Sequence, residues 1–494
     1  MSFVNHNHRP KQSGESMVSS LLGRRDFLRR LGGGFGSIAL AHLLGENSLF
    51  AATETSKPRA DLNGGLHHRA KVKRVIQLFM NGGASQIDTF DYKPRLIKLS
   101  GGKFDPGARV EAVTSSPGNL MKSPWDWKQH GQSGRWVSSV FPHIATCVDD
   151  LAFLMAMTTK SNAHGPANYM QNTGFLTPGF PCMGSWVSYG LGNLTENLPA
   201  FVVLPDSRGL PYNGTGSFSS GFLPVSTQGT VIKTSAPEPI FDLFLPPMAK
   251  SITQDGEKKG LALLNKMNRD HLAQNPGDSR LDARIAAYEL AAKMQLSAPA
   301  VLDTSGETEA TRKLYGLDKK ETEDFGRNCL VGRRLLEKGV RFVQVWSGPY
   351  GMHNNWDNHE NIGRELGSIA MSTDQPVAGL IKDLKARGMF EDTLVIWTTE
   401  FGRMPFTQGD LGRDHNGGTF VSWLAGAGIK GGVAYGSSDE WSWKAVENPT
   451  YCYDLHATVL HLLGINHEKL VFRNGGTDRR LTDVHGHVIQ EILT

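Results

Sequence analysis

The stretch 392-DTLVIWTTEFGRMP-405 joins the pattern of a buried strand to a polar exit. Leu394 to Trp397 is apolar and β-branched or aromatic, as a core strand requires. Two threonines lead from this run to Glu400, and Arg403 follows a glycine turn. Ligands of open α/β sheets bind outside the carboxyl ends of the strands, where several loops converge. The stretch therefore predicts a sheet strand that ends at a metal or anion site.

The same pattern recurs at four other apolar runs, each ending in polar residues: Val72 to Met80, Leu151 to Met157, Pro199 to Leu204 and Val340 to Trp346. Amphipathic segments lie between some of these runs. One of them is 376-PVAGLIKDLKARG-388, whose apolar positions form a single helical stripe. Strands that alternate with helices are typical of a largely parallel sheet. The sequence therefore predicts an α/β fold.

Histidines, carboxylates and other polar groups gather where these runs end. The candidates are Asn81, Asp88, Lys160, His164, Asp206, His353, Asp357, His359, Glu400, Asp414 and His415. The last two stand in 412-GRDHNGGTFVSWLAGAG-428, just before another apolar run. Taken singly, such residues are more often helix caps, turn formers or surface histidines. Their recurrence at several strand ends favours one shared site.

The length and the charge of the chain limit the classes of protein to which it could belong. With 494 residues the chain is long enough for one large domain with insertions, or for two domains. Its 52 basic and 48 acidic residues nearly balance. No basic stripe or nucleic-acid-binding motif is present, so we expect no nucleic-acid partner.

The N-terminus has the pattern of an export signal. The segment 23-GRRDFLRRLGGGFGSIALAHLLG-45 carries the pair Arg24 and Arg25 before a weakly apolar stretch. This is typical of a twin-arginine signal, whose apolar core is too short to span a bilayer. We expect residues 1–52 to be the signal and 53–70 a linker. The mature protein should be periplasmic or extracellular, without a membrane span, and an exported protein partner is possible in that compartment.

Residues 71–494 are expected to form the functional domain, with insertions near 92–135, 205–250 and 255–338. The first two are rich in loop-forming residues, and the third is helical, with 279-SRLDARIAAYELAAKMQL-296 as its clearest amphipathic helix. The four cysteines, Cys147, Cys182, Cys329 and Cys452, show no C-x-x-C spacing. Either disulfides or buried free thiols fit this number.

Two segments resemble landmarks of the alkaline-phosphatase-like superfamily, which includes sulfatases and phosphatases. The nucleophile segment of sulfatases has the form C/S-x-P-S-R-x-x-x-L-T-G, and 164-HGPANYMQNTG-174 keeps its proline and its closing Thr-Gly. Near the C-terminus, 454-DLHATVLHLLGI-465 is similar to the sulfatase pattern D-x-x-P-T-x-L-x-L-x-G. The segment around His415 resembles the last metal-binding histidine of phosphatases.

Across nearly its whole length the chain resembles a narrower group, the exported sulfatase-like proteins of the domain-of-unknown-function 1501 family. The supporting segments are 76-IQLFMNGGASQIDTFDYKP-94, 340-VRFVQVWSG-348, 356-WDNH-359, 398-TTEFGRMP-405 and 412-GRDHN-416. The resemblance implies an alkaline-phosphatase-like fold: a mainly parallel central sheet, helices on both faces, and loop and helical insertions. It implies no settled activity.

Three departures from the sulfatase pattern concern the chemistry. Asn81-Gly82 stands where sulfatases usually have paired aspartates, and Glu400-Phe401 replaces their later Asp-His or Asp-Asn pair. His164 occupies the nucleophile position, which is Cys or Ser in sulfatases. A formylglycine nucleophile is therefore excluded at that position. We expect attack by metal-activated water, without a covalent Cys or Ser intermediate.

The remaining polar residues can be divided into two ligand sets, since two-metal esterases hold a pair of cations. Asp357, His359 and His415 form the first set, with His353 or Asp414 as a substitute or outer partner. Glu400, His164 and either Asn81 or Asp88 form the second. Mixed imidazole and carboxylate ligands favour divalent zinc, manganese or iron, with calcium possible.

The expected function is hydrolysis of a phosphate or sulfate ester, on a small molecule or a glycan. His164, Arg403 and Lys160 are the catalytic candidates, and Arg403, Arg413 and His353 the substrate-binding ones, because guanidinium groups bind such anions through two hydrogen bonds. The alternative is a non-catalytic protein that binds a glycan or an exported partner, since fold does not imply function.

Overall fold

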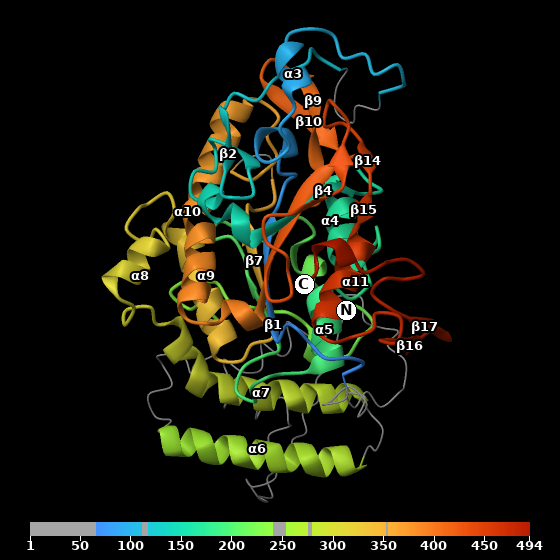
Figure 1. Cartoon of the computed structure of the whole chain (residues 1–494). Helices are drawn as coiled ribbons and strands as arrows, with labels where there is room; N and C mark the ends of the chain where they lie inside the picture. Colours follow the sequence, from blue (N-terminus) through green and yellow to red (C-terminus); the bar gives the residue numbers. More distant parts are fainter. Residues whose placement is uncertain (1–65, 111–116, 241–252, 275–278, 352–353) are drawn as a thin grey trace, which may run out of the picture.

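The computed structural model describes residues 66–110, 117–240, 253–274, 279–351 and 354–494 (Figure 1). The predicted signal peptide and most of the predicted linker lie outside these residues. Within the described part of the chain, no helix combines the length and apolarity needed to cross a membrane. The division into a linker, a domain and three insertions stays a prediction.

A nine-stranded sheet forms the centre of the described structure. The pairings between its strands are parallel, except those of β11 with β4 and β8. The predicted α/β fold with a mainly parallel sheet is confirmed, and β11 makes the sheet mixed. In spatial order the strands are β12 (Ala434–Tyr435), β4 (Leu151–Thr158), β11 (Phe420–Gly426), β8 (Thr393–Thr398), β1 (Arg74–Met80), β7 (Phe342–Ser347), β5 (Phe201–Leu204) and β6 (Thr230–Val231), and β15 (Thr450–Tyr451) pairs with β4.

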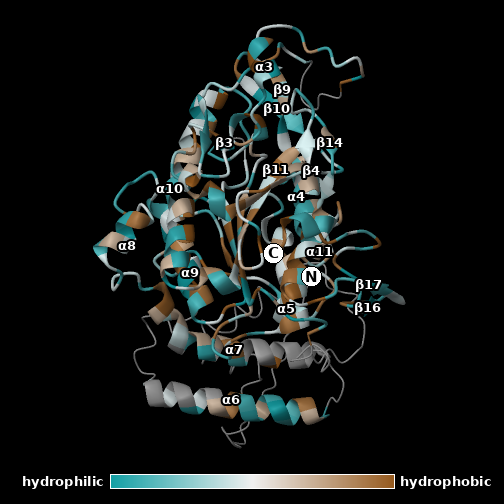
Figure 2. Ribbon diagram, in the orientation of Figure 1, coloured by the Kyte–Doolittle hydropathy of each residue, from teal (hydrophilic) through white to brown (hydrophobic). Residues whose placement is uncertain are grey.

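The central strands are apolar because helices cover both faces of the sheet. Along β1, Ile76 and Leu78 pack into one hydrophobic cluster while Val75 and Phe79 pack into another on the opposite face. The first cluster holds the helices α9 (Glu323–Glu337) and α10 (Ile362–Ala386). The second holds α5 (Met183–Leu191) and α11 (Cys452–Leu462), and α4 (His164–Thr173) packs against α11 on that face. Figure 1 shows these helices on the two sides of the strands, and Figure 2 shows hydrophobic residues along β4, β11 and α5.

A hairpin explains why β11 runs against its neighbours. The chain leaves β8 at the carboxyl edge of the sheet and forms two antiparallel strands, β9 (Gly402–Gln408) and β10 (Gly412–Asn416). It then re-enters the sheet beside β8 from the same edge, so β11 must run in the opposite direction. Arg403 follows the turn after β8, and Asp414 and His415 precede the next strand of the sheet, as the sequence predicted. The sequence did not predict that these residues lie on strands of their own, β9 and β10.

The remaining elements surround this core. They are α3 (Pro94–Lys98), α6 (Gln254–Gln274), α7 (Ser279–Leu302), α8 (Glu309–Leu314) and the short strand pairs β2 (Trp127–His130) with β3 (Arg135–Ser138), β13 (Ser437–Ser438) with β14 (Ala445–Glu447), and β16 (Phe472–Asn474) with β17 (Thr477–Arg479). All four cysteines are buried free thiols.

Candidate metal centre

The carboxyl edge of the sheet gathers residues from four segments. His164 is the first residue of α4, just after β4. Asp357 and His359 lie between β7 and α10, Glu400 follows β8, and His415 lies on β10. Because β4, β7 and β8 are parallel members of one sheet, their exits meet at the same edge.

Four of these residues converge on one point. Within the described residues, the potential ligand atoms of His164, Asp357, His359 and His415 all lie within 4.8 Å of one another. The Oδ1 atom of Asp357 is 3.1 Å from Nε2 of His164, 2.6 Å from Nε2 of His359 and 3.0 Å from Nε2 of His415. Four ligands at zinc bond lengths are about 3.3 Å apart, so small adjustments would place all four around one ion.

The outer nitrogen of each imidazole is held by an oxygen. Nδ1 of His164 donates to Glu400 Oε1 (2.8 Å), Nδ1 of His415 donates to the carbonyl of Asn162 (2.7 Å), and Nδ1 of His359 donates to the side-chain oxygen of Gln408. These acceptors place the proton of a neutral imidazole on Nδ1. The three Nε2 lone pairs are then left facing the cluster, which is the arrangement of metal-binding histidines.

The inner nitrogens show that the residues fit a cation. Nε2 of His359 lies 2.9 Å from Nε2 of His415, so two lone pairs face each other in these tautomers. Nε2 of His164 is buried and has no hydrogen-bond partner among the described residues, since its contact with Asp357 lacks hydrogen-bond geometry. A positive ion at the centre would satisfy all three nitrogens at once.

The positive charge of Arg403 compensates the negative charge of Asp357 at the centre of the cluster. Its Nη2 lies 2.7 Å from Oδ1 of Asp357, and both side chains are buried. Burial by itself raises the pKa of Asp357, but the charge of Arg403 beside the carboxylate lowers it, and that pKa lies well below its usual range. Burial lowers the pKa of His415 to about 4, and the charge of Arg403 adds to this effect. Asp357 is therefore ionised and His415 neutral at neutral pH.

Glu400 holds the imidazole of His164 through a hydrogen bond. Its Oε1 atom accepts both from Nδ1 of His164 and from the backbone N–H of Gly82 (2.8 Å). Gly82 has φ +122°, and a Cβ there would lie 2.6 Å from the backbone nitrogen of Asp357. Only glycine allows this approach without a shift of the Asp357 loop. Burial by itself lowers the pKa of His164, but the carboxylates of Asp357 and Glu400 outweigh burial and raise that pKa.

Helix α4 carries His164 and is fixed to the sheet by buried amides. The Nε2 of Gln344 on β7 donates to Oδ1 of Asn172 (2.8 Å), and Nε2 of Gln171 donates to Oγ1 of Thr398 (2.9 Å). Asn172 in turn donates to the carbonyl of Asn168 one turn earlier (2.8 Å). These bonds set the position of α4, and with it the position of His164.

The structure separates several predicted residues from the cluster. Asn81 donates its side-chain N–H groups to the carbonyls of Gly348 and Pro349, and its Oδ1 accepts from Asn168 (3.2 Å). The carboxylate of Asp88 is paired with Arg413 (2.7 Å) and accepts from Ser85. Neither side chain completes the predicted second ligand set, because both are engaged elsewhere.

The basic residues are likewise engaged. Arg413 is fully buried and donates to Asp88, Met404 and Met121, so we do not retain it as a substrate-binding residue. Arg403 is fully buried and donates to backbone carbonyls and Asp357, so its role is to hold the carboxylate rather than to bind substrate.

Two further candidates lie outside the group of four, and a third lies outside the described residues. Lys160 contacts the hydroxyl of Tyr453 at 3.4 Å, and its Nζ lies 5.1 Å from the centre of that ring. Asp414 accepts the backbone N–H of His415 (2.8 Å). His353 lies outside the described residues. None of the three can be assigned a ligand role from the described contacts.

Two aromatic side chains that pack against the cluster, Tyr212 and Phe401, were not predicted from the sequence. The ring of Tyr212 stacks on His164, with centroids 4.2 Å apart, and Phe401 lies 4.6 Å from His415 and 4.8 Å from His164. Phe401 was visible beside Glu400 in the sequence, but Tyr212 stands in a loop-rich segment that is far along the chain from His164. No spacing or periodicity links it to His164.

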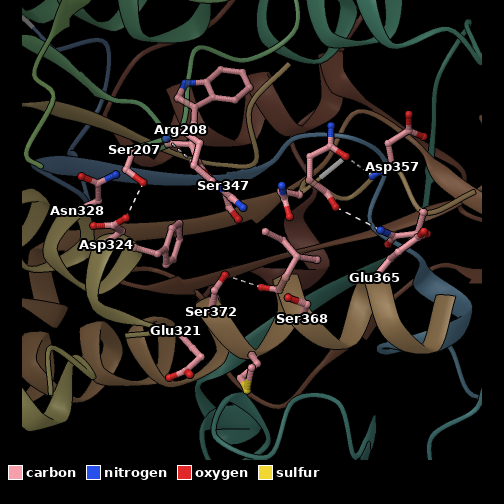
Figure 3. A pocket seen from close by; sticks show the side chains of 18 of the residues that line it. Ser207, Arg208, Glu321, Asp324, Asn328, Ser347, Asp357, Glu365, Ser368 and Ser372 are labelled. Carbon is pink, nitrogen blue, oxygen red and sulfur yellow. Dashed lines mark hydrogen bonds and ion pairs between the residues drawn. The ribbon is translucent and has the colours of Figure 1, made fainter. Parts of the chain in front are cut away.

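A cavity of about 630 Å³ lies between the Asp357 loop and the first turns of α9 and α10 (Figure 3). Its walls are polar, and Ser207 donates to Asp324 across one side (2.7 Å). Asp357 stands at its edge with the carboxylate pointing away from the cavity. A ligand in the cavity would therefore meet the other side of the Asp357 loop, not the histidines.

Comparisons with known proteins give a family and distant structural similarities. A family model described as "Protein of unknown function (DUF1501)" matches residues 72–493. No curated protein matches the sequence. One similar solved structure is the lipoteichoic acid synthase LtaP from Listeria monocytogenes, with 9% identity over 82% of this chain and 77% of that chain and a TM-score of 0.35. Another is the alkaline phosphatase from the Antarctic bacterium TAB5, with 10% identity over 80% of this chain and 99% of that chain and a TM-score of 0.34.

The sulfatase PsFucS1 from Pseudoalteromonas sp. is similar at 11% identity, over 88% of this chain and 72% of that chain, with a TM-score of 0.34. These three neighbours are thus a lipoteichoic acid synthase, an alkaline phosphatase and a sulfatase. At such low values the similarities assign no activity to the chain.

Zinc affinity should rise with pH over the range in which His164 loses its proton. An ion needs the unprotonated Nε2 of His164, whose pKa is raised, so at lower pH a proton must leave before the ion binds. His415 stays neutral over this range and adds no such dependence. Below the pKa of His164 the affinity should change about tenfold per pH unit. Competition titrations with a zinc-binding dye at several pH values measure this slope, and a pH-independent affinity would contradict the assignment.

Proposed function

Because the chain belongs to the DUF1501 family, whose description names no activity, we propose a function from the site itself. The protein is an exported, metal-dependent hydrolase of phosphate or sulfate esters, on a small molecule or a glycan. His164, Asp357, His359 and His415 hold one divalent ion. The observation that carries this proposal is the convergence of three Nε2 atoms on Asp357 while every Nδ1 is held by an oxygen.

The ligand chemistry favours zinc or manganese. Three imidazoles and one carboxylate suit borderline transition metals, whereas calcium takes oxygen ligands almost throughout. His164 and His359 keep 11% and 14% of their side-chain exposure, so the cluster is not sealed from solvent. Four protein ligands fill a tetrahedral zinc site, so a catalytic ion here would have to take water as a fifth ligand, as catalytic zinc can. The partial exposure of these two histidines leaves access for that water.

A divalent ion at this position would supply Lewis-acid chemistry, polarising an ester oxygen and lowering the pKa of water. The protein's own side chains preorganise the site for the ion. Asp357 brings a negative charge that Arg403 keeps ionised and oriented. Glu400 orients His164 and increases the basicity of its free nitrogen. The fixed imidazoles need no rearrangement when substrate binds, which favours a preorganised site.

Water is the proposed nucleophile, because no hydroxyl or thiol is among the four residues that converge on one point. His164 stands at the nucleophile position of the sulfatase pattern and points its Nε2 into the cluster. Thr399 donates to the carbonyl of Met80 (2.7 Å) and accepts from the N–H of Ala84 (3.0 Å). The hydroxyl of Ser161 is exposed and accepts from Ala163 in a local turn. No covalent seryl or cysteinyl intermediate is therefore proposed.

Hydrolysis of p-nitrophenyl phosphate or p-nitrophenyl sulfate should vanish on chelation and return with zinc or manganese. His415→Ala removes one ligand and should lower metal content and reduce kcat/KM by at least about 100-fold. Glu400→Gln should weaken metal binding about 10- to 100-fold, because it removes the charged partner of His164. Ser161→Ala should retain most of the rate.

The matched control is His143→Ala, since His143 is an exposed histidine outside the group of four. It should keep both metal and rate. Metal analysis and steady-state kinetics on the same samples make the comparison. If the pure protein holds no metal and binds a glycan without turnover, the non-catalytic alternative replaces the hydrolase.

Export by the twin-arginine route is part of the proposal. It rests on Arg24 and Arg25 before a glycine-rich, weakly apolar stretch, in a segment outside the described residues. In the full-length precursor, Arg24→Lys together with Arg25→Lys should leave the protein in the cytoplasm, because the twin-arginine signal requires both guanidinium groups. Cell fractionation detects the difference, with the unaltered precursor as control. Normal export of the double variant would contradict this route.

A further inference from the structure

Tyr212 contacts the cluster from a loop between β5 and β6 that supplies none of the ligands. Its ring is nearly parallel to the imidazole of His164, with an interplanar angle of 4° and centroids 4.2 Å apart. The hydrogen bond from Nδ1 to Glu400 leaves that imidazole free to turn about the bond axis. The flat contact with Tyr212 blocks this turning, because any rotation would drive one edge of the imidazole into the phenol ring. The stacked ring therefore fixes the plane in which Nε2 lies.

The hydroxyl of Tyr212 contacts another of the four ligand residues, Asp357. It lies 3.4 Å from Oδ2 of Asp357 and 3.1 Å from the carbonyl of Gly351, whereas the contacts of Asp357 with the three histidines are made by its other oxygen, Oδ1. A phenol hydroxyl carries its proton at neutral pH, so it acts as a donor shared between these two acceptors.

The backbone around Tyr212 is fixed to the same elements as the ligands. Its N–H donates to Oδ1 of Asn81 (3.4 Å), and its carbonyl accepts from Ser217 (2.7 Å). The next residue, Asn213, donates to the carbonyl of Gly165 in the first turn of α4 (2.8 Å). Tyr212 is therefore held in register with His164, and its side chain is largely buried.

We propose that Tyr212 is a positioning residue of the metal centre. Its ring fixes the plane of His164, and its hydroxyl steadies Oδ2 of Asp357. The ring contributes more than the hydroxyl, because the stack is a direct contact over a whole face, whereas the hydroxyl is divided between two acceptors. This inference rests on the proposed metal site, but it concerns ligand geometry and not the ester that is hydrolysed.

Zinc affinity and the visible spectrum of the cobalt-loaded protein test the proposal without any substrate. Tyr212→Leu removes the flat ring and should weaken zinc binding about 10- to 100-fold. It should also shift the cobalt absorption bands, which report ligand geometry. Tyr212→Phe keeps the ring and should stay within about fivefold of the wild-type affinity, the worth of one hydrogen bond, with wild-type bands.

The matched control is Tyr350→Leu. Tyr350 is 72% exposed and touches Tyr212 edge-on, with centroids 5.2 Å apart. Its removal takes away a tyrosine ring beside Tyr212 without touching a ligand, so affinity and spectrum should not change. Thermal unfolding of each metal-free variant checks that the fold is intact. If Tyr212→Leu does not fold, Tyr212→Met, which fills a similar volume without a flat ring, takes its place.

The outcomes separate this inference from the proposed function. If the wild-type protein binds neither zinc nor cobalt, both are overturned. If it binds them and the non-aromatic variant matches the wild type in affinity and spectrum, the positioning role alone is overturned. Equal losses in Tyr212→Phe and Tyr212→Leu would show that the hydroxyl, not the ring, does the positioning, and would overturn the role given to the ring.

Discussion

The buried ion pair between Asp357 and Arg403 is the interaction on which the site depends. A carboxylate buried in this way is tolerable only if a fixed positive group compensates it. Arg403 does so at 2.7 Å, and its other N–H groups donate to backbone carbonyls of Gly83, Trp356 and Arg413. One guanidinium thus joins the loop after β1, the loop after β7 and the hairpin. Removing it would leave a buried carboxylate and would also free the segments that carry the ligands.

The strands and the edge at which the site lies could be predicted from the sequence. Runs such as Leu394 to Trp397 are apolar because both faces of the sheet are covered, and polar residues follow where the strands end. The gathering of His164, Asp357, Glu400 and His415 at one edge follows from that rule. Which of them share one point does not, because loop geometry decides it.

The hairpin is the clearest example of what the sequence could not show. Four of the five residues of β10 are polar, yet all five are buried, and no apolar alternation marks them as a strand. The pair Asp88 and Arg413 is also fully buried without a sequence signal, since charged residues are ordinarily at the surface. The same limit applies to α4, whose buried Asn168, Gln171 and Asn172 face the sheet with amides instead of apolar groups. The hydrogen bonds of these buried amides fix the position of His164. Because the buried face of α4 is polar, a hydrophobic pattern does not predict this helix.

Metal-edge X-ray absorption, with anomalous diffraction from a crystal of the zinc-loaded protein, tests the central claim most directly. We expect one zinc ion per chain, with three imidazole nitrogens and one carboxylate oxygen at about 2.0–2.2 Å. The anomalous peak should lie among His164, Asp357, His359 and His415. A peak elsewhere, or two ions about 3.5–4 Å apart as in two-metal hydrolases, would contradict the account.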